Sequence, residues 1–186
     1  MESVWRNRSV VLGVSGGVAI YKIVGLASKL TRLGAAVDVV MTPAATEFIR
    51  PLMFGSITRR RVYLDPWDMS DHRPEHIALA ERPVVIVVAP ATADTLAKMA
   101  HGIADNLLTS VLLATAKPVL VAPAMNTVMW NAPATRGNMA LLAGRGVKAI
   151  GPVSGNLACG DVGEGRMVEV DAILREMERI ILAGES

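Results

Sequence analysis

Reactive and polar side chains follow runs of apolar residues at several places in this chain. The segment 122–130, which reads Ala-Pro-Ala-Met-Asn-Thr-Val-Met-Trp, comes directly after such a run. Asn126 offers a hydrogen-bond donor and an acceptor without a charge, so it can hold a carboxylate or an amide beside a cofactor. The alternative is a strand-to-helix connection in which Asn126 caps a helix while Met125, Met129 and Trp130 fill the core.

A glycine turn follows the first apolar run and could cradle a phosphate. Ser15, Gly16 and Gly17 lie between a predicted strand, 9–14, and a helical pattern that begins at Val18. Glycines let the backbone approach a ligand closely, and the N–H groups of a helix start can receive an anion. The spacing is neither that of a dinucleotide fingerprint nor that of a P-loop, and a plain tight turn is the alternative.

Hydroxyl groups stand at two further strand ends. Thr42 follows the predicted strand 36–41 and precedes Ala44, where a helix is expected to begin; the hydroxyl could meet a phosphate or a flavin edge, or only cap the helix. The strand 84–89 runs into a segment with hydroxyls, a carboxylate and helix-start N–H groups: Thr92, Ala93, Asp94 and Thr95. Because the carboxyl ends of parallel strands share one edge of a sheet, we expect these segments to lie together.

A histidine and the only cysteine could carry proton transfers. His76 lies just before the strand 84–89, and a surface or core position without chemistry is its alternative. Cys159 cannot form an internal disulfide. Its glycine-rich segment, 151–165, is expected to be a mobile loop with an exposed thiol, and a small apolar filler is the alternative. The arginine triplet at 59–61 is expected to be a solvated surface turn.

Composition and charge limit the classes of protein. Of 186 residues, 52% are hydrophobic and 4% aromatic, which favours an α/β fold with strands buried on both faces. We expect one domain over residues 1–186. A net charge of +2 argues against binding nucleic acid or an anionic membrane through bulk charge. The apolar runs fall far short of the roughly 20 residues of a membrane span, and no secretory signal or metal motif is found, so we expect a cytoplasmic protein.

Strands and helices are predicted to alternate, which gives a parallel sheet of five or six strands with right-handed crossovers. Predicted strands are 9–14, 36–41, 84–89, 118–121 and 147–150, and predicted helices are 18–33, 44–49, 95–101, 104–115, 134–142 and 170–182. Pairing is expected to stop where the fourth strand meets Pro123, because proline has no N–H to donate. The pattern weakens over 51–73, where no element is predicted.

Taken together, the strand-end segments resemble the flavin-containing cysteine decarboxylases, over about residues 9–167. The most specific segment is Pro-x-Met-Asn-x-x-Met-Trp, whereas the glycine turn alone would be weak. The segments that carry the resemblance are 14–22, 74–77 (Pro-Glu-His-Ile), 89–94, 123–130, 158–161 (Ala-Cys-Gly-Asp) and 165–167 (Gly-Arg-Met).

This resemblance implies a flavodoxin-like, Rossmann-type open parallel sheet with helices on both faces, and FMN as the cofactor. By position it implies that FMN is held by Ser15, Gly16, Gly17, Val18, Thr42, Ala44, Thr92, Ala93, Asp94, Thr95 and Ala124. The same resemblance makes His76 the base, Cys159 the proton donor of the last step, and Asn126 a catalytic residue that also binds substrate with Met125 and Met129. Asp94 stands where many members have asparagine, which puts one flavin hydrogen bond in doubt.

The activity implied by the resemblance is decarboxylation of 4′-phosphopantothenoylcysteine to 4′-phosphopantetheine in coenzyme A biosynthesis, through thioaldehyde and ene-thiolate intermediates. It also implies homotrimers or homododecamers with active sites at subunit contacts, and a ligase domain or chain of the same pathway as a partner. Decarboxylation of the C-terminal cysteine of a precursor peptide is the alternative. A flavin-binding regulatory subunit is the third hypothesis. It is disfavoured because His76, Asn126 and Cys159, the residues with implied catalytic roles, are all present.

Overall fold

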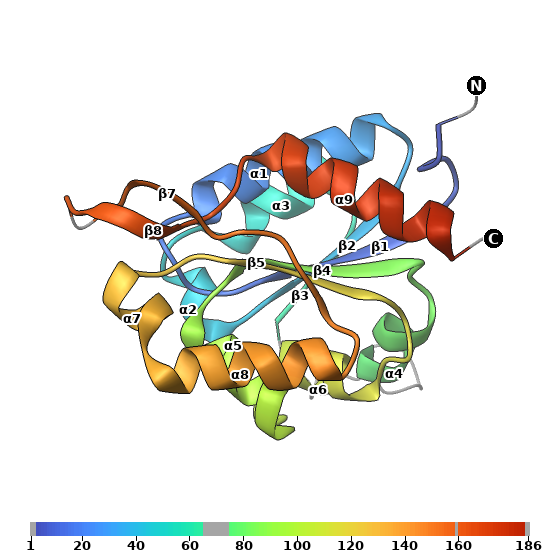
Figure 1. Ribbon diagram of the computed structural model, residues 1–186. Helices are drawn as coiled ribbons and strands as arrows, with labels where there is room; N and C mark the ends of the chain where they lie inside the picture. The colour runs from blue at the N-terminus through green and yellow to red at the C-terminus, as the bar shows by residue number, and fades with distance from the viewer. Residues whose placement is uncertain (1–2, 65–74, 159, 185–186) are drawn as a thin grey trace.

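One sheet of six parallel strands forms the centre of the computed structural model, which describes residues 3–64, 75–158 and 160–184 (Figure 1). The strand order is β3-β2-β1-β4-β5-β6, so the direction of winding reverses between β1 and β4. In open α/β sheets, ligands bind at the carboxyl ends of the strands beside such a reversal. The strands are β1 (Ser9–Val14), β2 (Ala36–Met41), β3 (Val62–Tyr63), β4 (Val85–Ala91), β5 (Val119–Pro123) and β6 (Lys148–Ala149).

Helices cover both faces of this sheet, which confirms the predicted fold class (Figure 1). One face carries α1 (Ile20–Arg32), α3 (Pro51–Thr58) and α9 (Val170–Ala183), and the other carries α4 (Glu75–Glu81), α5 (Ala93–His101), α6 (Leu107–Ala114) and α8 (Pro133–Gly144). Two short helices, α2 (Pro43–Thr46) and α7 (Thr127–Asn131), follow β2 and β5 at the carboxyl edge. Because helices cover both faces, the side chains of the central strands are buried on both sides, which explains why these strands are nearly continuous apolar runs.

The prolines in two strands change the predicted strand ends. The sequence places the end of the third predicted strand at residue 89, but β4 continues through Pro90 to Ala91. Pairing between β4 and β5 shifts register between Val88 and Ala91, which accommodates a residue without an N–H. The expectation that pairing stops at Pro123 is also wrong: β5 includes it, because the next N–H, of Ala124, donates to the Ala91 carbonyl at 3.1 Å.

The segment without a predicted element holds α3 and β3. Helix α3 begins with Pro51 in its first turn and buries only Phe54 and Thr58, so its sequence lacks a clear apolar stripe. The predicted helix 44–49 is in fact the single turn of α2. None of the described helices is long and apolar enough to cross a membrane.

The glycine-rich segment forms a hairpin, which corrects the expectation of a mobile loop. Strands β7 (Val153–Asn156) and β8 (Val162–Arg166) pair antiparallel beside the carboxyl edge of the main sheet. Close packing explains two of the hairpin's glycines, Gly163 and Gly165. A Cβ at Gly163 would overlap the Thr127 hydroxyl, and one at Gly165 would overlap the Met125 carbonyl oxygen.

Candidate active site

A cavity of about 1150 Å³ opens at the carboxyl edge of the sheet. Its wall comes from the segments after β1, β2, β4 and β5 and from the β7–β8 hairpin, so the predicted segments do lie together. All predicted cofactor residues except Ser15 line it, and so do the predicted substrate residues Met125, Asn126 and Met129. Ligand sites commonly enclose about 300–1,000 Å³, so this cavity has room for a cofactor and part of a substrate.

Ser15 lies behind the cavity wall and braces it. Its side chain is buried, donates to the Pro90 carbonyl at 2.6 Å and accepts the Thr92 N–H at 3.1 Å. The serine therefore ties the turn after β1 to the turn after β4. Direct contact of Ser15 with a cofactor stays a prediction.

Gly16 lies where the segments after β1 and β2 touch. A Cβ added to Gly16 would come within 2.6 Å of the Ala44 Cβ and 2.7 Å of its carbonyl oxygen. At Gly17 the nearest atom would be the Thr92 methyl at 3.5 Å, an ordinary contact. The two glycines therefore have different roles. Gly16 allows the segments after β1 and β2 to pack against each other, and Gly17 leaves its backbone accessible from the cavity.

Two threonines of the wall cap the helices that follow them, as the alternative interpretation of Thr42 proposed. The Thr42 hydroxyl accepts the Ala45 N–H at 3.2 Å, and the Thr92 hydroxyl accepts the Thr95 N–H at 3.3 Å. Both threonines also line the cavity. Capping and ligand contact are compatible, because a hydroxyl can accept and donate at once.

A lysine between two carboxylates sets the charge at one end of the cavity. Lys98 Nζ lies 3.2 Å from Asp94 Oδ2 and 2.9 Å from Asp105 Oδ2, and all three residues line the cavity. The hydrogen bond between Lys98 and Asp105 raises the pKa of Lys98 and lowers the pKa of Asp105. The hydrogen bond therefore favours the charged forms of both Lys98 and Asp105.

A second cluster brings cations to the cavity beside the hairpin. Lys22 of α1 and Arg166 of β8 line the cavity, and both face Glu169, with Lys22 Nζ at 2.7 Å and an Arg166 guanidinium nitrogen at 3.8 Å. The hydrogen bond from Lys22 lowers the pKa of Glu169. Sequence reasoning assigned no role to Lys22, Lys98, Asp105 or Arg166, although Lys22 and Arg166 lie in the segments that carry the resemblance.

Asn126 is held firmly from both ends of its amide. Oδ1 accepts the Val128 N–H at 2.7 Å, which caps α7 and confirms the alternative interpretation, while Nδ2 donates to Asp161 Oδ2 at 3.3 Å. The Met125 N–H donates to the Gly165 carbonyl at 3.0 Å, so the hairpin is joined to this segment through the backbone as well. The amide of Asn126 is thereby presented to the cavity in a fixed direction.

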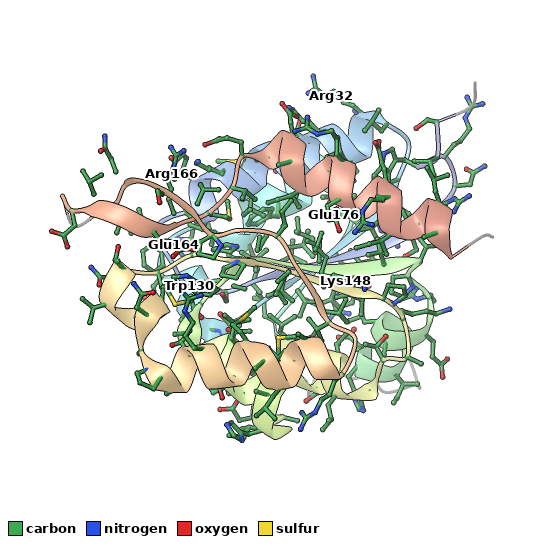
Figure 2. All side chains as sticks on the ribbon, in the orientation of Figure 1. Arg32, Trp130, Lys148, Glu164, Arg166 and Glu176 are labelled. Atoms are coloured by element: carbon green, nitrogen blue, oxygen red, sulfur yellow. The ribbon has the colours of Figure 1, made fainter. Side chains whose placement is uncertain are left out.

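The hairpin is also fastened to the helices after β5. Figure 2 labels Trp130 and Glu164 where β8 meets α7. The Arg136 guanidinium lies 4.5 Å from the centre of the Trp130 ring and 3.5 Å from Glu164 Oε2. Trp130 is buried, as the core-filling interpretation proposed, whereas Met129 is 49% exposed and faces the cavity.

The structure does not bring His76 to this cavity. His76 is the second residue of α4, is half-buried, and is not among the residues that line the cavity. Cys159 lies outside the described residues. Of the two predicted catalytic residues that the structure describes, Asn126 lies at the cavity of a single chain and His76 does not.

The cavity wall fits a flavin mononucleotide on its own chemistry. Accessible glycine backbone and the start of α1 suit a phosphate, while Val18, Ala93 and Ala124 offer small apolar surface for a ring system. Across the described part of the chain, no group of three or more His, Cys, Asp or Glu side chains is placed to hold a metal ion.

Comparison with known proteins gives a consistent result. The model of the Flavoprotein family matches residues 2–182. A probable phosphopantothenoylcysteine decarboxylase of Streptococcus mutans is 45% identical over 92% of this chain and 98% of its own length. The coenzyme A biosynthesis bifunctional protein of Bacillus subtilis is also 45% identical, over 93% of this chain, but the chain spans only 43% of that relative.

Solved structures give the same picture. A mutant PPC decarboxylase complexed with pantothenoylaminoethenethiol is 37% identical, with a TM-score of 0.84 over 97% of this chain and 100% of that chain. The FMN-dependent cysteine decarboxylase SpaF is 27% identical, with a TM-score of 0.84 over 98% of this chain and 99% of that chain.

Proposed function

The chain belongs to the Flavoprotein family, and on that premise we propose that it catalyses FMN-dependent decarboxylation of 4′-phosphopantothenoylcysteine to 4′-phosphopantetheine in coenzyme A biosynthesis. The observation that carries the proposal is the cavity in which the fixed amide of Asn126 shares a wall with the flavin-holding segments. The similarity of the chain to the Streptococcus mutans relative, over nearly the whole length of that protein, supports phosphopantothenoylcysteine as the substrate. Residues 1–186 act as one FMN-binding decarboxylase domain.

Each proposed residue has a separate task in this reaction. The segments that line the cavity would hold FMN, which would supply a hydride acceptor for the carbon that bears sulfur; the resulting C=S bond could take up the electrons released with CO₂. His76 takes the thiol proton, a task suited to imidazole. Asn126 orients the substrate carboxylate through Nδ2, whose direction is fixed by the bond from Val128 N–H to Oδ1. Cys159 supplies the proton that, together with the hydride that reduced FMN would return, saturates the ene-thiol product.

We propose that copies of the chain complete one another's sites, as homotrimers or as homododecamers of four trimers. The separation of His76 from the cavity supports this, because a base must reach the thiol it deprotonates. Apolar side chains exposed close together in the sequence, at Phe48, Leu52 and Met53, offer contact surface. A ligase domain or chain of the same pathway is the further partner that we propose, since bifunctional relatives extend beyond the matched region. We place the protein in the cytoplasm.

Decarboxylation of a peptide ending in cysteine is the second candidate, favoured by the similarity to the peptidyl-cysteine decarboxylase EPID, which is 25% identical with a TM-score of 0.75 over 94% of this chain. Two reactions distinguish the candidate substrates. Purified protein is incubated with phosphopantothenoylcysteine and with such a peptide, and the mass of each product is measured. We expect yellow protein with noncovalent FMN and a loss of CO₂ from the small molecule alone. Colourless protein that takes up no FMN, or turnover of the peptide only, would contradict the proposal.

Substitution of His76 tests its assignment as the base. We expect His76→Asn to bind FMN as the native protein does, because residue 76 does not line the cavity of its own chain, and to lose decarboxylation by at least about a hundredfold. Flavin absorbance and CO₂ release measure the two effects. His101→Asn, on the exposed end of α5, is the matched control and should be fully active. A His76→Asn protein with native turnover would remove His76 from the mechanism.

A further inference from the structure

We propose that the ion pair between Arg61 and Glu75 positions His76, so that these two residues act as positioning residues for the reaction. This inference rests on the proposed function, in which His76 is the base. Arg61 guanidinium nitrogen lies 2.5 Å from Glu75 Oε1, and Glu75 is the first residue of α4, directly before His76. Neither residue lines the flavin cavity.

The arginine triplet is exposed on the surface, as the sequence suggested, but two of its side chains also reach buried carboxylates. Arg60 Nε lies 2.8 Å from Asp38, a carboxylate of β2 that is 2% exposed, and this hydrogen bond raises the pKa of Arg60. Arg61 pairs with Glu75, whose side chain is 7% exposed. Two consecutive arginines therefore reach two buried carboxylates that lie far apart in the sequence, one in the sheet and one at the start of a helix.

Because Glu75 is buried, its ion pair with Arg61 restrains the start of α4. A buried carboxylate is strongly destabilised unless a cation and hydrogen bonds compensate for its lost hydration. The ion pair with Arg61 therefore restrains the first turn of α4. A negative charge also suits the first turn of a helix, so the pair fixes Glu75 where α4 itself favours an acid.

The arginine end of the pair is held by the sheet. Arg61 directly precedes β3, which pairs with β2 through Val62 and Tyr63. The Arg61 guanidinium also lies 5.2 Å from the centre of the Tyr63 ring, which limits its rotamers. The ion pair therefore links the start of α4 to the main sheet. Because His76 directly follows Glu75, this link also fixes the position of His76. A displacement of about 1 Å in a reacting group can lower a rate about a hundredfold.

The first test compares neutral variants of the two buried pairs. We expect Arg61→Gln and Glu75→Gln to lower kcat about tenfold or more, with KM and FMN content unchanged, since binding groups are untouched. The double variant should be no slower than either single one, and Arg61→Lys should recover most of the rate. The control is Arg60→Gln, which breaks a pair of matched exposure but leaves Arg61 and the pairing of β3 with β2 in place; its kcat should be native.

The second test needs no catalysis. Amide hydrogen exchange of the FMN-bound protein is compared among the variants, and α4 should exchange faster in Arg61→Gln and Glu75→Gln but not in Arg60→Gln. Unchanged exchange in α4, additive rate losses in the double variant, or an equal kcat loss in Arg60→Gln would each overturn the proposal. If native protein releases no CO₂ from phosphopantothenoylcysteine, the proposed function fails, and the exchange result still decides whether the pair holds α4.

Discussion

Gly16 has a requirement that its neighbour Gly17 does not share. A methyl group at residue 16 would meet the backbone of Ala44 at 2.7 Å, and that backbone cannot rotate away as a side chain can. We expect Gly16→Ala to push the segments after β1 and β2 apart, lowering the stability of the flavin-free protein by about 1–3 kcal/mol. Thermal unfolding of flavin-free protein measures this. Gly17→Ala is the control, and an equal loss there would refute the distinction.

The Cys159 assignment can be tested through the product. Cys159→Ser should still release CO₂, but a hydroxyl donates its proton far less readily at neutral pH than a thiol with an ordinary pKa of about 8.5. The product should accumulate as the ene-thiol, about two mass units below the saturated thiol, because a proton and a hydride are not returned. Mass spectrometry checks this. Fully saturated thiol formed at the native rate would make Cys159 a filler.

At the scale of elements, the β7–β8 hairpin depends on glycine at its contact with α7. We expect Gly163→Ala to displace the hairpin, because the added Cβ would overlap the Thr127 hydroxyl. Asn126 would then lose its bond to Asp161, so KM for the substrate should rise severalfold while the unfolding temperature changes little. Gly137→Ala, in α8 with open space around it, is the control and should leave KM unchanged. An unaltered KM in Gly163→Ala would contradict the packing argument.

At the scale of the whole molecule, charges across one face of the sheet predict a loss of stability in acid. Lys22 and Lys29 of α1 bind Glu169 and Asp171 beside the start of α9, and these hydrogen bonds lower the pKa of both carboxylates. A carboxylate whose pKa is lowered by folding stabilises the native state above its ordinary pKa of about 4, and that stabilisation is lost as the pH falls through the lowered value.

The unfolding temperature should therefore decrease as the pH falls below about 5. The effect should be modest and should shrink in high salt, since both carboxylates are more than half exposed. Lys29→Met should flatten the curve. Thermal unfolding at a series of pH values in low and high salt checks this, and a curve that Lys29→Met leaves unchanged would exclude Lys29 as its source.

The sequence alone determined the alternation of strands and helices and the segments that line the cavity. Continuous apolar runs such as 84–89 and 119–122 form strands where helices cover both faces, and parallel strands must bring their carboxyl ends to one edge. Threonines after strands were recognised as caps or ligands because local chemistry allows both. Such inferences succeed because they depend only on residues within one or two turns of each other.

Only the tertiary structure decided what depends on partners distant in sequence. The sequence predicted that the arginine triplet is exposed, but not that Arg60 and Arg61 pair with the buried Asp38 and Glu75. It also gave no sign that Gly163 and Gly165 pack against Thr127 and the Met125 carbonyl. The separation of His76 from the cavity also has no local signal. Desolvation and steric overlap depend on which residues the fold brings into contact. A sequence pattern therefore does not predict them when the contacting residues are distant in the chain.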